Sequence, residues 1–188
     1  MNKRILALLA AIVATSIFGF NHTIAKELMP NVLSPNALLY CRVIGAAVCF
    51  WLISLFVERE KVEVRDFKLI FICAIFGMGL NMITALNGLY NSTPINSAII
   101  TTLAPIFIFL ISVIILNEKI AKRKYIGVFI GFCGTLALIL LNDKSVSTAP
   151  NINLGNFYLF INSISYALYF VLVKPLTEKY SMITIMKW

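Results

Sequence analysis

Long apolar blocks, nearly free of charged residues, run along most of this 188-residue chain, and their length is its most constraining feature. A block of roughly 17 to 22 residues is what a helix needs to cross about 30 Å of hydrocarbon, since each helical residue rises about 1.5 Å. Hydrocarbon offers no water to pair the backbone N–H and C=O groups, so each block must be helical. Hydrophobic residues make up 60% of the chain and charged residues only 13%, which leaves little for a water-soluble domain. The sequence therefore predicts an all-α polytopic membrane protein.

Six of these blocks are long enough to form a complete span, and a seventh begins close to the C-terminus. We expect the six spans at residues 5–25, 36–57, 69–90, 95–116, 125–141 and 157–173. The seventh block starts near Ser181, and only about eight of the roughly 20 residues that a span needs are present. A helix that ended there would leave polar end groups in hydrocarbon, so we expect roughly another 100 residues in the complete protein.

Outside the spans, lysine and arginine lie mostly on one side of the predicted bundle. That side carries Lys3, Arg4, Arg59, Lys61, Arg65, Lys68, Lys119, Lys122, Arg123, Lys124, Lys174 and Lys179. The other side carries Lys26 and Lys144. Basic residues collect in cytoplasmic connections, so we expect a cytoplasmic N-terminus, and the charged connection 58–68 is expected to be a solvated loop. This distribution accounts for the net charge of +8 without a nucleic-acid partner.

A short pattern of residue types occurs near the start of the chain and again near its end. In each copy an aromatic residue and a small residue precede a lysine, and a serine follows in the next connection. The copies are Phe18, Gly19, Lys26 and Ser34, and then Tyr166, Ala167, Lys174 and Ser181. About five predicted spans separate them, and an odd number makes the second copy enter the membrane from the opposite face. We therefore expect inverted five-helix repeats, with the first at residues 1–145 and the start of the second at 146–188.

Polar and small residues recur at helical spacing along one face of the first, third, fourth and sixth predicted spans. A bundle with a polar interior requires such stripes, because the opposite faces must meet lipid. With one arginine of the second span added, the candidate pathway residues are Thr15, Gly19, His22, Arg42, Asn81, Thr84, Asn87, Ser97, Thr101, Pro105, Asn162, Tyr166 and Tyr169. Small and polar residues also make ordinary contacts between membrane helices, worth about 0.6 kcal/mol on average. Packing is the more frequent role for any single one, whereas the stripes together favour a cavity.

Three of these candidates each have an alternative, purely structural explanation. His22 is the only histidine and could titrate near neutral pH, but a neutral imidazole could equally hold a neighbouring helix. Arg42 would cost about 2.5–3.5 kcal/mol at mid-bilayer, so it should face protein or water, or extend to the nearby membrane surface. Pro105 removes one helical hydrogen bond in the fourth span. The resulting break could line a pathway or could be a kink accommodated by packing.

Acidic residues and enzyme-like groupings are missing from the predicted spans. All eight Asp and Glu residues lie in connections or at span ends, so coupling through a buried carboxylate has no support. The four cysteines lie in apolar blocks without C-x-x-C spacing, which gives no metal site. A single histidine leaves almost no acid–base repertoire, and no hydrolase motif is present. We therefore expect no enzyme, no cofactor and no metal.

The segment from 92 to 141 resembles the EamA family of the drug/metabolite transporter superfamily. The matching features there are the residues after Pro94, Ala104-Pro105, Leu116-x-Glu118 and the series Gly127, Gly131 and Gly134. Ser16-Ile17-Phe18-Gly19 leading to Lys26, and Leu39-x-x-Arg42, fit the same family, although the family often has tryptophan where this chain has Phe18. The glycine series is best explained by close helix packing. The resemblance implies ten spans in two inverted repeats, and movement of small organic molecules, amino acids among them, across a bacterial inner membrane.

Together these features predict a secondary transporter that works by alternating access. It would export or exchange a small-molecule substrate across the lipid bilayer of the inner membrane, and its oligomeric state is left open. Two other classes remain as alternatives: a non-transporting membrane subunit or receptor, and an integral-membrane enzyme. Saturable flux of a labelled metabolite would separate the carrier from both.

Overall fold

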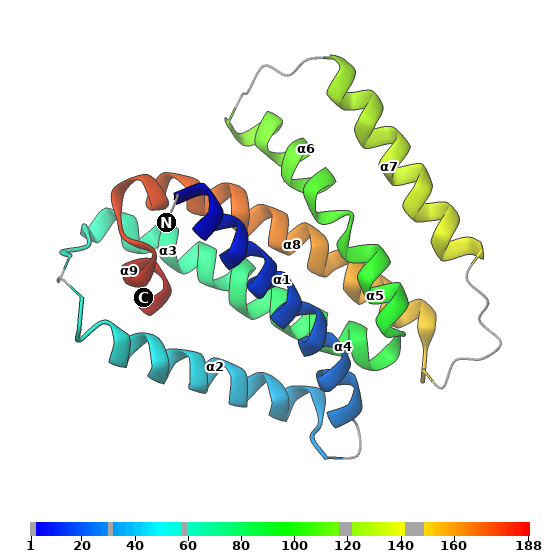
Figure 1. Ribbon diagram of the computed structural model, residues 1–188, viewed down its shortest axis with the longest axis horizontal. Helices are drawn as coiled ribbons and strands as arrows, with labels where there is room; N and C mark the ends of the chain where they lie inside the picture. The colour runs from blue at the N-terminus through cyan, green and yellow to red at the C-terminus, as the bar shows by residue number, and fades with distance from the viewer. Residues whose placement is uncertain (1–2, 30–31, 58–59, 117–121, 142–148) are drawn as a thin grey trace.

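The computed structural model describes residues 3–29, 32–57, 60–116, 122–141 and 149–188, and the side chain of His22 lies outside that description. Within those ranges all regular structure is helical (Figure 1). The elements are α1 (Lys3–Leu28), α2 (Pro35–Ile53), α3 (Val64–Ala74), η1 (Ile75–Leu80), α4 (Asn81–Asn91), α5 (Pro94–Thr101), α6 (Ala104–Leu116), α7 (Lys122–Leu141), α8 (Ile152–Lys179) and α9 (Met182–Lys187). η1 is a π-helix that joins α3 and α4 into one continuous rod.

In the described part of the chain, five helical segments are long and apolar enough to cross a membrane. They are Arg4–Leu28, Pro35–Ile53, Val64–Asn91, Pro94–Ile115 and Ile152–Lys179, and they coincide with predicted spans one to four and six. α7 occupies the place of predicted span five with 20 residues. These findings confirm the all-α polytopic class. The break that Pro105 predicts in span four lies just before it, where α5 ends at Thr101 and α6 begins at Ala104.

Side chains that accept hydrogen bonds from the first helical turn set the starts of four helices. Ser34 accepts from Ala37 at 3.2 Å before α2, and Asn151 accepts from Leu154 at 3.1 Å before α8. The caps of the other two helices, α5 and α9, are Thr93 and Ser181. Such caps satisfy backbone N–H groups that have no partner inside the helix. Both serines of the repeated pattern therefore begin a helix.

α8 is the central helix of the described bundle. It lies against the α3–η1–α4 rod on one side and against α5 and α6 on the other (Figure 1). Its buried face includes Leu159, Ala167 and Leu176, which are 1%, 0% and 1% exposed. Gly155, near the start of α8, packs on Ser92, just past the end of α4, so α8 runs back along the rod in the opposite direction.

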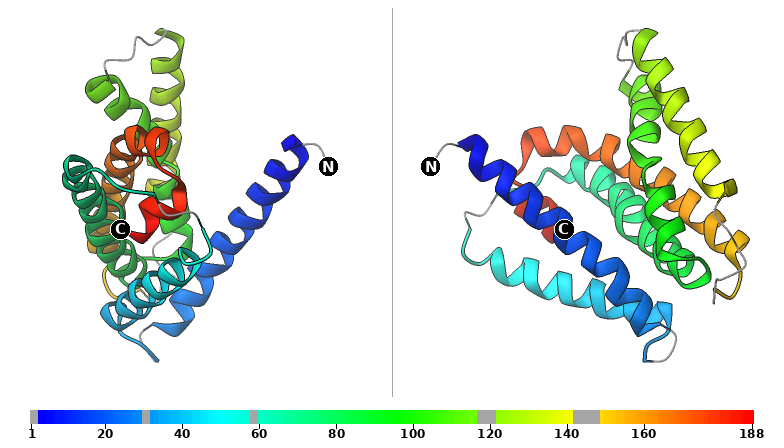
Figure 2. Two further views of the ribbon diagram at one scale, coloured as in Figure 1. Left: turned by 90° about the vertical axis from the view of Figure 1, so that its left-hand side faces the viewer. Right: turned by 45° about the vertical axis from the view of Figure 1, so that its right-hand side comes forward.

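α1 touches the bundle only near its C-terminal end. Lys26 reaches the end of α4, and Ala25 and Met29 are buried beside it, whereas the described side chains at 4–21 are exposed. Figure 2 shows α1 inclined away from the other helices toward its N-terminus. Because the end of α1 and the start of α8 lie at the same end of α4, the two helices run in opposite directions.

The charged stretch 58–68, expected as a solvated loop, is mostly exposed in its described residues, but from Val64 on it forms the first turns of α3. The Asp66 carboxylate accepts from Lys179 Nζ at 3.0 Å and from the Tyr180 hydroxyl at 2.8 Å. Glu60 accepts from the backbone N–H of Ser181 at 2.9 Å. The segment is therefore solvated as expected, and the polar end of α8 also supplies donors that its carboxylates bind. Residues 58–59 lie outside the described part.

Candidate functional site

Side chains of α8 bind backbone carbonyls at the π-helical turn, near the middle of the α3–η1–α4 rod. Ser165 Oγ donates to the Phe76 carbonyl at 2.7 Å, and Asn162 Nδ2 donates to the Asn81 carbonyl at 2.8 Å. A π-turn departs from regular helical pairing, and in a membrane its carbonyls need partners from neighbouring helices. We call Phe76, Asn81, Asn162 and Ser165 the α8 seam. It joins predicted span six to predicted span three.

The aromatic ring of Tyr169 completes this contact. A Cβ added to Gly77 of η1 would lie 2.5 Å from Tyr169 Cδ2, so only glycine admits the ring at that position. The ring of Tyr166, one turn earlier on α8, lies 6.4 Å from the ring of Tyr169 and is 40% exposed. The structure therefore brings four predicted pathway residues to one place: Asn81, Asn162, Tyr166 and Tyr169.

A second cluster of polar residues lies at the connection between α4 and α5. Ser92 Oγ donates to Asn156 Oδ1 at 2.7 Å, and Asn96 Nδ2 donates to the same oxygen at 3.4 Å. Ser163 Oγ donates to the Ile100 carbonyl at 3.2 Å. Ser97 is 0% exposed, and its Oγ has no hydrogen-bond partner among the described residues. The bonds of Asn96 and Ser163 link α8 to the fourth predicted span, and the bond of Ser92 links α8 to the connection before that span.

The other predicted residues of spans three and four bond within their own helices. Thr84, buried, donates to the Leu80 carbonyl at 2.7 Å. Asn87 Nδ2 donates to the Ile83 carbonyl at 2.8 Å, and Thr101 Oγ1 donates to the Ala98 carbonyl at 2.8 Å. Back-bonding of this kind satisfies a hydroxyl or amide without a partner from another helix.

The candidates on α1 and α2 lie apart from the α8 seam. Thr15 is exposed and donates to the Ala11 carbonyl, and a Cβ at Gly19 would meet no atom within 4 Å. Arg42, half-buried on α2, donates from Nη2 to Asn21 Oδ1 on α1. The arginine therefore faces a neighbouring helix. The candidate His22 side chain is outside the described residues.

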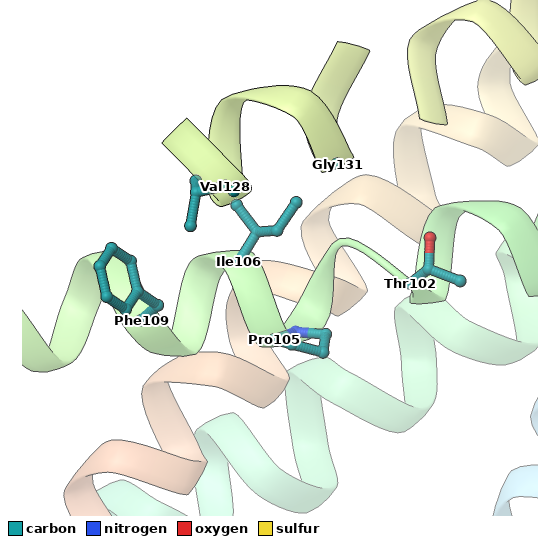
Figure 3. Close-up of a pocket in the computed structure, with 7 residues that line it drawn as sticks. Thr102, Pro105, Ile106, Phe109, Val128 and Gly131 are labelled. Atoms are coloured by element: carbon teal, nitrogen blue, oxygen red, sulfur yellow. The ribbon is translucent and has the colours of Figure 1, made fainter. Parts of the chain in front are cut away.

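Pro105 borders a cavity of about 480 Å³ between α6 and α7 (Figure 3). Its walls are mostly apolar, with Ile106, Phe109 and Val128 beside the hydroxyl of Thr102. A Cβ at Gly131 would come within 3.4 Å of Ile106, whereas Gly127 and Gly134 have nothing within 4 Å. The close packing expected of this glycine series is therefore found only at Gly131. At the other two positions the described part of the neighbouring helix is too far away.

Lys26 marks a site that the candidate residues did not include. Its Nζ donates to the carbonyls of Leu89, Tyr90 and Ser92, each at 2.7 Å. In the sequence this lysine appeared in the repeated pattern and in the family-like motif of the first span, but not among the candidate pathway residues. Metal binding is a separate matter: the described residues contain no group of three or more His, Cys, Asp or Glu side chains that could hold an ion.

Three features define this as a polytopic membrane protein of the transporter type. They are the apolar helices of membrane-spanning length, the interruption of the fourth span, and the π-turn that side chains of a neighbouring helix bind. Residues 5–140 match the EamA-like transporter family, and the chain belongs to that family. Membership of a transporter family argues against an enzyme.

The chain is similar to several curated transporters that are themselves uncharacterised. The transporter YetK of Bacillus subtilis is 26% identical, over 98% of this chain and 56% of YetK. A transporter of Archaeoglobus fulgidus is 30% identical, over 81% of this chain and 52% of its own length. The transporter YyaM of Bacillus subtilis is 28% identical, over 84% of this chain and 52% of its own length. The chain thus spans about half the length of these relatives, and no solved structure matches it.

Proposed function

We propose that this chain forms the first five-helix unit, and the beginning of a second inverted unit, of an alternating-access secondary transporter. The carrier exports or exchanges small polar or amphipathic metabolites, amino acids or their relatives among them, across a bacterial inner membrane, with its N-terminus in the cytoplasm. The observation that supports this proposal is the opposite direction of α1 and α8, each of which is followed by a serine-capped helix. Inverted pairs of this kind build the two exchangeable halves of many carriers.

The repeat also accounts for the exposure of α1. In the repeated pattern Thr15 and Gly19 correspond to Ser163 and Ala167, which are 1% and 0% exposed on α8. The α8 pair packs on the first unit, where Ser163 donates to Ile100. A pseudo-twofold axis between the two five-helix units would place Thr15 and Gly19 of α1 against the second unit in the same way. We therefore expect the small-residue face of α1 to be a contact face in a protein of the relatives' length.

The proposed pathway runs along the faces of α1 and α8 that meet the opposite unit. Tyr166 and Tyr169 offer rings to an amphipathic substrate, and Arg42, held by Asn21, places a positive charge beside α1. The residues of the α8 seam are joined by hydrogen bonds from side chains to carbonyls, and such polar contacts between membrane helices contribute only about 0.6 kcal/mol each on average. Since all acidic residues of the chain lie in connections or at span ends, we favour a facilitator or exchanger over carboxylate-coupled transport.

The decisive experiment uses a protein of the relatives' full length, reconstituted in vesicles and tested for counterflow of a panel of labelled metabolites. Saturable flux of at least one metabolite, absent from empty vesicles, is the expected result. Flux that is no faster than leakage across the whole panel would contradict the carrier.

A second experiment tests the inverted arrangement without a substrate. Val32→Cys and Asn153→Cys, each alone in a cysteine-free chain, should react with a membrane-impermeant reagent from the same side. Lys61→Cys is the control and should react from the other side. Labelling of the first two positions from opposite sides would exclude the inverted repeat.

A further inference from the structure

The ammonium group of Lys26 is held as a bound cation would be held. Three backbone carbonyls, those of Leu89, Tyr90 and Ser92, each accept from Nζ at 2.7 Å. A lysine ammonium has three N–H donors and no acceptor, so all its donors are used here. We call these three carbonyls the carbonyl cage.

The sequence of the α4–α5 connection makes this cage. In a continuing helix the Tyr90 carbonyl would accept from residue 94, but Pro94 has no N–H. Ser92 and Thr93 are extended, with φ of −117° and −104°, so the chain leaves the helix before its last carbonyls are paired. The C-terminal end of a helix also carries partial negative charge. The cage therefore attracts a cation whatever group supplies it.

Burial and the absence of a counter-ion show that carbonyl dipoles, and not a carboxylate, balance this charge. Ala25 and Met29 beside it are 2% and 3% exposed, and Leu89 is 3% exposed. Lys26 forms no ion pair with a described carboxylate, whereas Lys179 pairs with Asp66 and Glu63 near the other end of the α3–η1–α4 rod.

The helices that pack around the cage carry few titratable side chains near it. α1 adds the exposed Glu27, and α4 adds the half-buried Tyr90. α2 adds Tyr40, which is exposed, and Arg42, which bonds Asn21 on α1. α5 has no titratable side chain, and the imidazole of His22, one turn before Lys26, lies outside the described residues. Lys26 is therefore the group whose protonation decides whether the cage holds a cation.

We propose that the carbonyl cage is a monovalent-cation site that the protein fills with its own lysine, and that release of the Lys26 proton opens it. The C-terminal ends of broken helices and unwound carbonyls hold the coupling cation in other carriers. When Lys–NH₃⁺ gives its proton to water at this end of the helix, the neutral amine keeps two donors. Its lone pair then faces the third carbonyl. The end of α1 is thereby released from the α4–α5 connection.

The role of this release in a transport cycle rests on the proposed carrier function, but the cage itself can be tested without transport. Lys26→Ala removes the ammonium and leaves room in the cage, whereas Lys26→Met fills the same space without a charge. The probe is sodium, compared with choline at equal ionic strength, and the readout is the midpoint of thermal unfolding in detergent. Sodium should raise the midpoint of Lys26→Ala by roughly 3 °C or more and leave Lys26→Met and the native chain unchanged. Equal midpoints of Lys26→Ala in both salts would overturn the cation site.

A second measurement keeps Lys26 in place, so it does not depend on the folding of Lys26→Ala. The protein for this measurement carries only two cysteines, the substitution Ala25→Cys at a buried position and the exposed native Cys41. The rate of thiol labelling at position 25 is divided by the rate at Cys41. This ratio is followed from about pH 7 to about pH 10.5, the range over which an ordinary lysine loses its proton. The ratio should rise several-fold with pH, and it should stay low throughout when Lys26 is replaced by the permanently charged arginine. A flat ratio in the lysine protein would overturn the proton-controlled release. Neither result depends on counterflow, so this proposal and the carrier can fail separately.

Discussion

Asn81 and Asn162 exchange hydrogen bonds across the interface between α4 and α8. Asn162 Nδ2 donates to the Asn81 carbonyl at 2.8 Å, and Asn81 Nδ2 donates to the Asn162 carbonyl at 3.4 Å. Each side chain binds the other residue's backbone, so the pair fixes the position of one helix along the other. The first bond also satisfies a carbonyl where the π-turn ends.

The two bonds should differ in their contribution to stability. Asn162→Ala removes the shorter of the two bonds between the helices and leaves the Asn81 carbonyl only the Thr84 hydroxyl, at 3.1 Å, as a side-chain donor. It should lower the free energy of unfolding by about 1 kcal/mol. Asn81→Ala removes the longer bond and should cost less. Unfolding in mixed micelles at increasing SDS measures both. The control is Asn87→Ala, whose amide bonds only within its own helix, and a loss there equal to that of Asn162→Ala would contradict the assignment.

The start of α8 should tolerate no side chain at Gly155. A Cβ there would lie 2.6 Å from Ser92 Cβ and from the Ser92 backbone nitrogen, so Gly155→Ala must push backbone apart. Overpacking of this kind costs about 1–3 kcal/mol. The matched control is Gly79→Ala, whose Cβ would meet only the Ala74 carbonyl at 3.9 Å. Gly79→Ala should be neutral or stabilising in the same SDS titration, and equal losses at both glycines would show that close approach is not the cause.

Corresponding positions of the repeated pattern should respond in opposite ways in this chain. Ala167→Leu puts a large side chain into a site that is 0% exposed and should destabilise by about 1–3 kcal/mol. A Cβ at Gly19 would meet no atom within 4 Å, so Gly19→Leu should raise helix stability by up to about 1 kcal/mol. Thermal unfolding of the two variants tests this difference. In a protein of the relatives' length we expect Gly19→Leu to become destabilising, and continued tolerance there would contradict the second contact.

The docking of α9 should depend on pH through Glu60. Thr184 and the Ser181 backbone N–H hold the pKa of this carboxyl below its usual value. A lowered pKa in the folded state means that the contact stabilises above the ordinary value of about 4.3 and is lost as pH falls through the lowered pKa. This contribution to the docking of α9 should therefore be complete at neutral pH and be lost in acid, which favours detachment of α9 there.

Tryptophan fluorescence reports this detachment, because the ring of Trp188 lies 5.7 Å from the ring of Trp51 in the docked state. The emission should change at acidic pH in the native chain. Glu60→Gln cannot ionise, so its acid transition should shrink. An unchanged transition in Glu60→Gln would assign the effect to another carboxyl, such as Asp66.

Some local features could be read from single residues. Ser34 and Ser181 were recognised as a repeated pair, and both cap a helix, because a serine that precedes an apolar run accepts from the first turn wherever the helix later lies. Pro105 predicted the break in span four for a similar reason, since a missing N–H is a property of proline alone.

The partners of the polar residues could not be predicted in this way. Asn162 was expected on the polar face of span six, but nothing in its identity, or in that of Ser165, pointed to the carbonyls of Asn81 and Phe76. Lys26 appeared in the repeated pattern and in the family-like motif of span one, and neither pointed to the carbonyls that it binds. Every residue has a backbone carbonyl, so a side chain that binds one leaves no complementary signal in the sequence.

The sequence by itself determined that this is a helical membrane protein, because block length and backbone pairing in hydrocarbon allow no other structure. It also predicted a polar face on the first, third, fourth and sixth spans, since helical periodicity is local. Only the tertiary structure decided what those faces meet: the seam of α8 on the π-turn, the carbonyl cage around Lys26 and the docking of Glu60 on Ser181. These contacts join residues far apart in the chain, and their energy depends on how whole helices are placed relative to one another.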